Sequence, residues 1–343
     1  MRTLKYLVLA LSLALGACSK KAEEPLLING AGATFPYPLY SKWFSEYQTV
    51  DPTVQINYQS IGSGGGIRQL LDKTVDFGAS DAPMKNEELA KSEVPVLHIP
   101  TVLGAVVLSY HLPEIQELLQ LSPDVIADIF LGKIKEWNDP RIQALNPSIK
   151  FPEKLPIIVV QRSDGSGTTA VFTDYLSKVS EEWRNKVGAD KSVSWLTGVG
   201  GKGNEGVAGQ IKQTPGAIGY LELVYAEQNK LPAAAVQNAA GAFVKASPAS
   251  VSAAASAFAD SMPVDFRISI TNPLNNAAAY PISSFTYLLV YQKMASDKGK
   301  KLVDFLNWAM EKGQSFAEPL SYAPLPSSLV PTVKEKIASV QVQ

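Results

Sequence analysis

The chain has 343 residues, of which 31 are basic, 32 are acidic and one is a cysteine. This even charge balance offers no basic field for nucleic acid, and one cysteine cannot form an internal disulfide, so the fold must depend on packed cores. The length is ample for two domains. The two histidines, His98 and His111, have no cysteine or carboxylate cluster at metal-ligand spacing, so a histidine-rich metal site is not expected.

The N-terminal segment predicts export. Two basic residues precede an apolar run at 7–14, which is too short to cross a bilayer and is typical of a signal-peptide core. The run continues into Leu15-Gly-Ala-Cys18, which resembles a bacterial lipobox. We therefore interpret residues 1–17 as a lipoprotein signal peptide, Cys18 as the lipidated N-terminus and residues 18–25 as the tether. The alternative is an ordinary signal peptide followed by an incidental cysteine.

Strand-like and helix-like segments alternate through the rest of the chain. Apolar and polar residues alternate at 54–58, as in a half-buried strand, and the apolar runs at 105–110, 157–160 and 287–291 suit strands covered on both faces. Three stripes between them have helical spacing: Tyr40, Trp43, Phe44 and Tyr47; Ile67, Leu70 and Leu71; Phe172, Tyr175, Leu176 and Val179. The alternation predicts an α/β fold with mostly parallel sheets, and those aromatic residues are predicted to be core.

Two stretches interrupt this alternation. Residues 135–156 are rich in proline, asparagine and charge, and we expect a surface connection there. Residues 232–258 are rich in alanine and serine. We expect this second stretch to contain a pair of strands around Ala240-Gly241, followed by a helix that starts at Ser247-Pro248.

Three glycine-rich loops with serine or threonine each precede one of the predicted helices. They are Gly30–Pro36, in which Thr34 is a candidate N-cap, Gly62–Gly66 and Arg162–Thr168. A helix N-terminus has unpaired N–H groups and the positive end of the helix dipole, and glycine lets a ligand approach the backbone closely. One such loop is usually a plain helix cap. Three in one chain, one of them with an arginine, indicate an oxyanion site.

Asp81 narrows the range of anions that the site is predicted to bind. It follows the strand-like segment 75–80 and precedes Pro83, so the simpler interpretation is a helix cap. If Asp81 faces the anion instead, its ionised carboxylate can only accept hydrogen bonds. It would repel a fully deprotonated anion such as sulfate and tolerate mono- or dihydrogen phosphate, which still carries a proton.

Other glycine-containing segments match known nucleotide-binding and catalytic motifs poorly. Gly30-x-Gly32 lacks the third glycine of a dinucleotide fingerprint, and Gly198–Lys202 has neither the spacing of a phosphate-binding P-loop nor a Ser/Thr after the lysine. Asp164–Gly167 is not the Gly-x-Ser-x-Gly elbow of a serine hydrolase.

Long ungapped segments resemble the family of periplasmic phosphate-binding proteins that serve phosphate-specific ABC importers. They are GAGATFPYPLYSKW from Gly30, IGSGGGIRQ from Ile61, VDFGASDAP from Val75, IFLGKIKEWND from Ile129, RSDGSGTT from Arg162, GGKGNEGV from Gly200 and GAIGY from Gly216. The resemblance extends from about Asn29 to Tyr322-Ala-Pro-Leu-Pro, and departs from the family pattern in the segment 232–258.

The resemblance implies an α/β fold of the two-lobed type II periplasmic-binding-protein class. Its mixed sheets are flanked by helices, and two crossover hinge strands join the lobes around a ligand cleft. In this chain, residues 26–102 plus 281–343 would form lobe 1, and residues 103–280 would form lobe 2.

The resemblance also implies a set of phosphate-binding residues, matched position by position. They are Thr34, Phe35, Ser63, Asp81, Arg162, Ser166, Gly167 and Thr168. Asp164 matches the aspartate that pairs with the site arginine, and a bidentate pair would fix the guanidinium. No catalytic residue, cofactor or metal is implied.

The expected function is therefore capture of inorganic phosphate and its delivery to the membrane permease and ATPase subunits of an ABC importer. The protein would be a monomeric periplasmic lipoprotein held to a membrane through Cys18, and not an enzyme. Three alternatives stay open: a receptor for another protonated oxyanion such as arsenate, a secreted phosphate-ester hydrolase with Ser63 or Ser166 as nucleophile, and an added role in adhesion or sensing. The hydrolase would need a base or metal that the sequence does not reveal.

Overall fold

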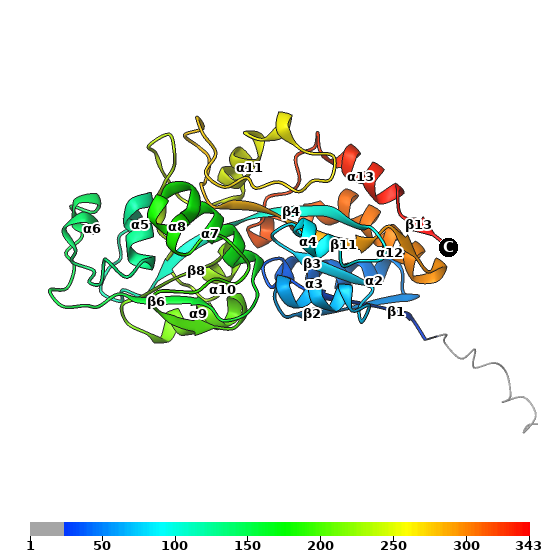
Figure 1. Cartoon of the computed structure of the whole chain (residues 1–343), viewed down its shortest axis with the longest axis horizontal. Helices are drawn as coiled ribbons and strands as arrows, with labels where there is room; N and C mark the ends of the chain where they lie inside the picture. Colours follow the sequence, from blue (N-terminus) through cyan, green and yellow to red (C-terminus); the bar gives the residue numbers. More distant parts are fainter. Residues whose placement is uncertain (1–23) are drawn as a thin grey trace, which may run out of the picture.

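A computed structural model describes residues 24–343 of the chain (Figure 1). The predicted signal peptide and the predicted lipidation at Cys18 lie outside the described residues. Between residues 24 and 343, no helix has the length and apolar character needed to cross a membrane.

One eight-stranded sheet runs along the molecule in the order β2-β1-β3-β11-β4-β8-β6-β7. Its strands are β1 Leu26–Gly32, β2 Val54–Ser60, β3 Phe77–Ser80, β4 Val96–Tyr110, β6 Ile158–Arg162, β7 Val199–Gly201, β8 Ala217–Glu222 and β11 Ser283–Tyr291. Three short strands form a second sheet: β5 Gln120–Leu121, β9 Ala235–Gln237 and β10 Phe243–Val244. A third sheet pairs β12 Lys293–Met294 with β13 Gln341–Val342.

The large sheet is mixed. β1 pairs in parallel with β2 and β3, and β6 pairs in parallel with β7 and β8. β11 and β4 are antiparallel to each other and to their outer neighbours β3 and β8. Strand–helix alternation predicts parallel pairing, which holds at both ends of the sheet but not at its centre, because β4 and β11 are long strands that run in opposite directions.

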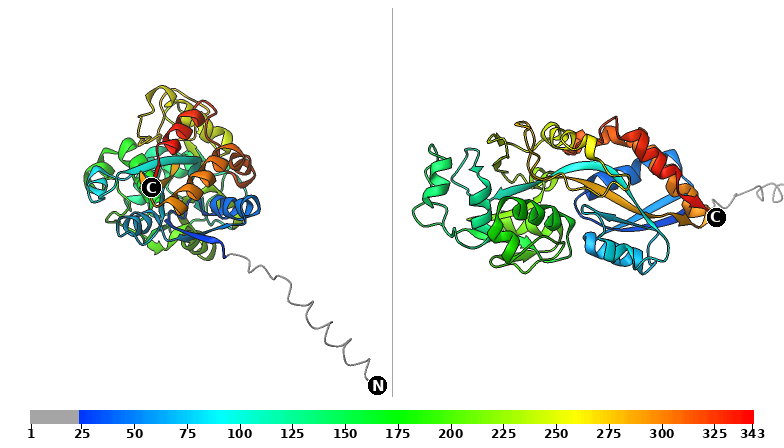
Figure 2. Two further views of the ribbon diagram at one scale, coloured as in Figure 1. Left: turned by 90° about the vertical axis from the view of Figure 1, so that its right-hand side faces the viewer. Right: turned by 45° about the horizontal axis from the view of Figure 1, so that its top comes forward.

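The centre of the sheet joins two halves. We call β1–β3 with their helices the first half, and β6–β8 with their helices the second half. β4 pairs with β11 through Ala105 and with β8 from Val106 onward, so this one strand runs from the first half into the second. Figure 1 shows β4 and β11 spanning the space between the two groups of helices. The turned view in Figure 2 shows the same first and second halves.

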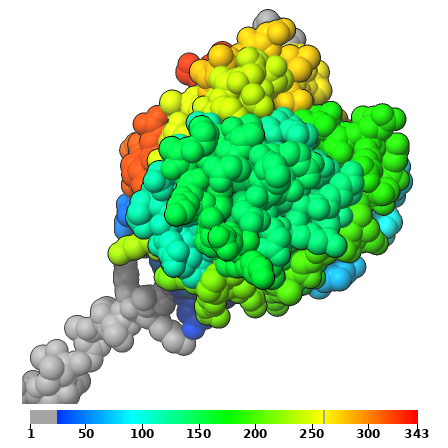
Figure 3. Space-filling model, turned by 90° about the vertical axis from the view of Figure 1, so that its left-hand side faces the viewer, coloured from blue at the N-terminus to red at the C-terminus, as the bar shows by residue number. Residues whose placement is uncertain are grey.

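The helices lie over the faces and ends of this sheet. They are α2 Tyr37–Val50, α3 Ser63–Leu71, α4 Asn86–Leu89, α5 Pro123–Phe130, α6 Pro140–Leu145, α7 Gly167–Val179, α8 Glu181–Lys186, α9 Gly203–Gln213, α10 Leu223–Gln228, α11 Pro248–Ser256, α12 Ser296–Glu311 and α13 Val330–Ala338. Short 3-10 turns occupy Ala259–Ser261, Gly313–Phe316 and Glu318–Leu320. Seen from its far end, the second half presents a continuous rounded surface (Figure 3).

Both stretches that interrupt the strand–helix alternation, 135–156 and 232–258, contain regular secondary structure. Residues 135–156 include the short helix α6. In 232–258, β9 and β10 pair antiparallel, and α11 begins at Pro248 with Ser247 as its N-cap. The predicted strand pair and helix are therefore confirmed.

Buried aromatic side chains hold α2 and α7 against the sheet. Trp43 in α2 is fully buried, and its indole N–H donates to the carbonyl of Gly313 at 2.7 Å. Phe172 in α7 stacks on Tyr220 of β8 with ring centroids 4.5 Å apart. Burying one large apolar side chain contributes roughly 1.5–3 kcal/mol, so these contacts fix both helices firmly in place.

Candidate functional site

Helix N-termini from both halves face one another where the halves meet. α3 begins at Ser63 after β2, α7 begins at Gly167 after β6, and α9 begins at Gly203 after β7. The first two loops are in direct contact, because the Gly64 N–H donates to the carbonyl of Gly165 at 2.9 Å. First-turn N–H groups have no partners within their own helix, so this junction concentrates hydrogen-bond donors and the positive ends of helix dipoles.

Glycine at position 167 permits this close approach. A methyl group added to Gly167 would lie 2.4 Å from Ser63 Oγ and 2.5 Å from Asp81 Oδ2. Both distances are far below van der Waals contact. The N-terminus of α7 can therefore reach Ser63 and Asp81, which belong to the first half, only because residue 167 has no side chain.

Arg162 and Asp164 form a bidentate ion pair at the end of β6. Arg162 Nε donates to Asp164 Oδ1 at 2.8 Å and Nη2 donates to Oδ2 at 2.6 Å. The Arg162 side chain is 1% exposed, and Asp164 Oδ1 also accepts the Gly203 N–H at 3.0 Å. Burial opposes ionisation of Asp164, but the hydrogen bonds and charge of Arg162 together with the Gly203 N–H hold its pKa below the ordinary value.

Asp81 is a second carboxyl in the same place, with different partners. It is 1% exposed; its N–H donates to Ser63 Oγ at 3.3 Å, and its Oδ1 accepts from Thr286 Oγ1 at 3.0 Å. Burial raises the pKa of Asp81 to about 7, although the Thr286 hydrogen bond and the nearby charge of Arg162 lower it. Lys85 occupies the N-cap of α4, so Asp81 does not cap that helix.

Thr34 and Phe35 lie in the loop between β1 and α2, and both are buried. Tyr225 Oη donates to the carbonyl of Thr34 and Tyr322 Oη donates to that of Phe35, each at 2.6 Å, which fixes the orientation of the loop backbone. The sequence suggests Thr34 as the N-cap of α2. The structure corrects this, because α2 begins at Tyr37 after Pro36, and the Thr34 hydroxyl is engaged elsewhere.

Ser166 is the N-cap of α7, and Thr168 lies in its first turn. Ser166 Oγ caps the helix by accepting the Thr169 N–H at 3.0 Å. Thr168 Oγ1 accepts from Arg162 Nη1 at 3.3 Å. With these two residues, all the residues predicted for the site come together in one buried cluster, formed by loops of the two halves.

Sequence reasoning missed two residues of this cluster. Thr286, on β11, bonds Asp81 from 205 positions away in the chain. Asn204, at the start of α9, donates to the hydroxyls of Thr34 and Thr168. Asn204 lies in the glycine-rich segment that begins at Gly200, and that local signal could have drawn attention to it. Thr286 lies in an ordinary apolar strand and gives no such signal.

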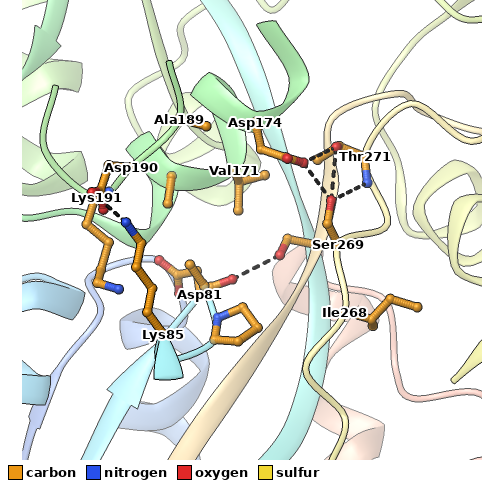
Figure 4. A pocket seen from close by; sticks show the side chains of 14 residues that line it. Asp81, Lys85, Val171, Asp174, Ala189, Asp190, Lys191, Ile268, Ser269 and Thr271 are labelled. Atoms are coloured by element: carbon orange, nitrogen blue, oxygen red, sulfur yellow. Dashed lines mark hydrogen bonds and ion pairs between the residues drawn. The ribbon is translucent and has the colours of Figure 1, made fainter. Parts of the chain in front are cut away.

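A cavity of about 200 Å³ borders the cluster beside Asp81 (Figure 4). Its rim joins the two halves through two ion pairs. Lys85 Nζ lies 2.7 Å from Asp190 Oδ2, and Lys191 Nζ lies 2.9 Å from Glu88 Oε2. The two halves are thus held together at the mouth as well as in the interior.

The described residues contain no group of three or more histidine, cysteine or carboxylate side chains placed to hold a metal. His98 Nε2 accepts the Met84 N–H at 3.0 Å, and burial lowers the pKa of His98 to about 4. Ser63 and Ser166 each accept a backbone N–H rather than pairing with a histidine. The hydrolase alternative therefore gains no support from the site.

Known proteins are similar to this chain in both sequence and fold. A family model described as a PBP superfamily domain matches residues 19–312. A phosphate-binding protein PstS of Haemophilus influenzae is 47% identical over 311 residues, which cover 90% of this chain and 92% of that protein. PstS of Methanocaldococcus jannaschii is 44% identical and covers 85% of this chain and 81% of that protein. The chain belongs to the PstS family of phosphate-binding proteins.

Solved structures agree with this PstS assignment at the level of the fold. A high-affinity periplasmic phosphate-binding protein (PfluDING) bound with phosphate superposes with a TM-score of 0.70 at 23% identity, covering 90% of this chain and 93% of that one. An ancestral soluble variant of the human phosphate-binding protein gives a TM-score of 0.71 at 21% identity, covering 92% and 99%. The predicted type II periplasmic-binding-protein fold is confirmed.

Proposed function

We propose that this protein binds inorganic phosphate, as mono- or dihydrogen phosphate, and delivers it to an ABC-type phosphate importer. The observation that carries the proposal is the buried cluster itself. It places a charge-neutralised arginine and several helix N-termini around Asp81, a carboxyl whose pKa is raised by burial to about 7. The curated relatives at 44–47% identity are named as phosphate-binding proteins.

The proposed contacts are the ones predicted from the sequence. Phosphate oxygens would accept from first-turn N–H groups of α3 and α7, from the backbone of the loop before α2, and from hydroxyls and Arg162. Asp81, when ionised, would accept a hydrogen bond from the oxygen on which phosphate retains its proton. The full set is Thr34, Phe35, Ser63, Asp81, Arg162, Ser166, Gly167 and Thr168, with Asp164 behind the arginine.

The two halves of the sheet support a hinge mechanism. We assign residues 26–102 plus 281–343 to one lobe and residues 103–280 to the other, with β4 and the segment leading into β11 as the crossovers. Phosphate would enter an open cleft and be enclosed as the lobes close, which removes water and strengthens each hydrogen bond to the anion. Docking on the permease and ATPase subunits would reopen the lobes. We expect the protein to act as a monomer.

We further propose that the protein is exported to the periplasm and anchored through lipid on Cys18. One solved neighbour, PfluDING, is described as a periplasmic phosphate-binding protein. Cell fractionation tests the anchor: wild type should partition with membranes, and Cys18→Ala should move to the soluble periplasmic fraction. Equal partitioning of the two would show that Cys18 carries no anchor.

Calorimetric titration with phosphate, arsenate and sulfate tests the function. Above pH 7, where Asp81 is mostly ionised, we expect tight binding of phosphate by wild type and no measurable binding of sulfate. Asp81→Asn should partly lose that preference, because it removes the negative charge that repels a deprotonated anion. Sulfate binding as tight as phosphate binding would refute the proposal. Arsenate also carries a proton near neutral pH, so its affinity decides between a phosphate receptor and a receptor for protonated tetrahedral oxyanions in general.

A further inference from the structure

Asn204 makes four hydrogen bonds inside the site, and two of them join the two halves. It is fully buried at the start of α9. Its backbone N–H and its side-chain Nδ2 both donate to Thr34 Oγ1, at 3.2 and 2.7 Å. Nδ2 also lies 3.3 Å from Thr168 Oγ1, and Oδ1 accepts the Glu222 N–H at 2.9 Å.

The Glu222 contact fixes which way the amide of Asn204 points. A side-chain amide can be turned over, which exchanges its oxygen with its nitrogen. In Asn204 the turned amide would direct an N–H₂ donor at the Glu222 N–H, leaving two donors opposed in a buried place. The oxygen must therefore face Glu222, and the nitrogen must face the two threonines.

This arrangement decides how the threonine hydroxyls are used. A hydroxyl has one proton to donate and two lone pairs that accept. Thr34 Oγ1 accepts twice from Asn204, and Thr168 Oγ1 accepts once from Asn204 and once from Arg162. With both lone pairs occupied, each hydroxyl can act further only as a donor.

We propose that Asn204 is a positioning residue that makes Thr34 and Thr168 obligate donors to the bound anion. An anion is repelled by hydroxyl lone pairs and attracted by hydroxyl protons, so holding both protons toward the enclosed anion strengthens its contacts with the two hydroxyls in the closed form. The inference rests on the proposed phosphate function and adds a residue to it. Because Thr34 belongs to the first half and Asn204 to the second, Asn204 orients Thr34 only when the halves are together.

A double-mutant cycle on phosphate binding tests this role. Inorganic phosphate is titrated calorimetrically into wild type, Asn204→Ala, Thr34→Val and the double variant at one pH and one ionic strength. We expect Asn204→Ala to weaken binding about 10- to 100-fold, as for loss of a hydrogen bond to a charged group. In the Thr34→Val background the same change should cost at least about fivefold less, because the hydroxyl it orients is gone.

The matched control is Asn238→Ala. Asn238 is also a buried amide, 3% exposed, and its Nδ2 donates to the carbonyls of Asn276, Ala277 and Ala279, away from the site. The Asn238→Ala variant should have a lower melting temperature than wild type and an unchanged phosphate Kd. If Asn238→Ala weakens phosphate binding as much as Asn204→Ala, or if the effects of Asn204→Ala and Thr34→Val simply multiply, Asn204 is structural and the inference fails.

A second variant covers the case in which Asn204→Ala does not fold. Asn204→Asp keeps the shape but replaces the donor with a carboxylate oxygen, which accepts from both hydroxyls and turns their protons away from the anion. Its loss of affinity should again shrink in the Thr34→Val background, and an unchanged loss would overturn the inference. Wild type that fails to bind phosphate in the same titration would refute the proposed function itself, whereas binding by wild type with independent variants refutes only the role of Asn204.

Discussion

At the residue scale, the site separates two aspartates by their surroundings. Asp164 has a guanidinium in bidentate contact, so it stays ionised and serves to hold Arg162. The buried Asp81 carboxyl accepts a hydrogen bond from the Thr286 hydroxyl, and burial raises its pKa to about 7. The same type of side chain therefore holds a cation at position 164, and at position 81 we propose that it selects anions that carry a proton.

The raised pKa of Asp81 makes stability depend on pH. In the unfolded chain this carboxyl has its ordinary pKa of 3.8, whereas in the folded protein it is about 7. Between these values the folded protein keeps a proton that the unfolded chain has lost, so this group's contribution to the free energy of unfolding falls as pH rises from about 4 to about 7. Asp81→Asn should abolish that fall and gain up to about 4 kcal/mol over wild type at the upper end.

Urea unfolding of phosphate-free protein at several pH values checks this. Thr286→Val is the companion variant, because removing the hydroxyl that donates to Asp81 should raise the pKa of Asp81 further and extend the fall to higher pH. A stability difference between wild type and Asp81→Asn that does not vary with pH would contradict the assignment.

The Arg162–Asp164 pair predicts a defect that phosphate partly repairs. Asp164→Asn leaves the 1% exposed guanidinium without its counter-charge, which should cost about 3 kcal/mol in the absence of ligand. Saturating phosphate should restore part of the loss, because the anion neutralises Arg162. Thermal unfolding with and without phosphate measures both quantities. Asp265→Asn, in an Asp–Arg pair of the same spacing whose side chains are 50% and 26% exposed, should cost less than 1 kcal/mol. Similar losses in both variants would count against the prediction.

At the element scale, the start of α7 sets how closely the halves can approach. Gly167→Ala would place a methyl group 2.4 Å from Ser63 Oγ and 2.5 Å from Asp81 Oδ2, and should weaken phosphate binding at least about 100-fold because the anion-binding loops are forced apart. Gly209→Ala is the matched control within α9, where an added methyl group has no atom within 4 Å. It should raise stability by roughly 0.5–1 kcal/mol and leave the Kd unchanged. Calorimetry measures the phosphate Kd of both variants, and urea unfolding measures their stability.

At the scale of the whole molecule, the ion pairs at the cavity rim should favour the closed form. Lys191 is 9% exposed and pairs with Glu88 across the junction, so Glu88→Gln leaves a nearly buried ammonium without its counter-charge. We expect phosphate affinity to fall about 3- to 10-fold, mainly through faster release measured by stopped flow. Glu46→Gln, in an exposed pair within α2, should leave release unchanged. Equal release rates in Glu88→Gln and wild type would show that the rim does not hold the halves together.

Local rules predicted much of this molecule. Helical spacing from Tyr40 to Tyr47 and the strand pattern at 54–58 were sufficient to place α2 and β2, because the period of burial is written directly into neighbouring residues. Ser247-Pro248 marked the start of α11 for the same reason, since a cap and a first-turn proline act within one turn. The glycine-rich loops likewise signalled helix N-termini suited to an anion.

What the chain by itself determined was which short segments could donate to an anion; tertiary structure decided how those donors are aimed. The antiparallel centre of the sheet, the Thr286 hydroxyl on Asp81 and the Asn204 amide between Thr34 and Thr168 all join residues far apart in sequence. Hydrogen bonds of this kind depend on distance and angle, which no local pattern specifies. Thr34 shows the difference: its position before α2 suggested a helix cap, but its hydroxyl accepts from Asn204, 170 residues later.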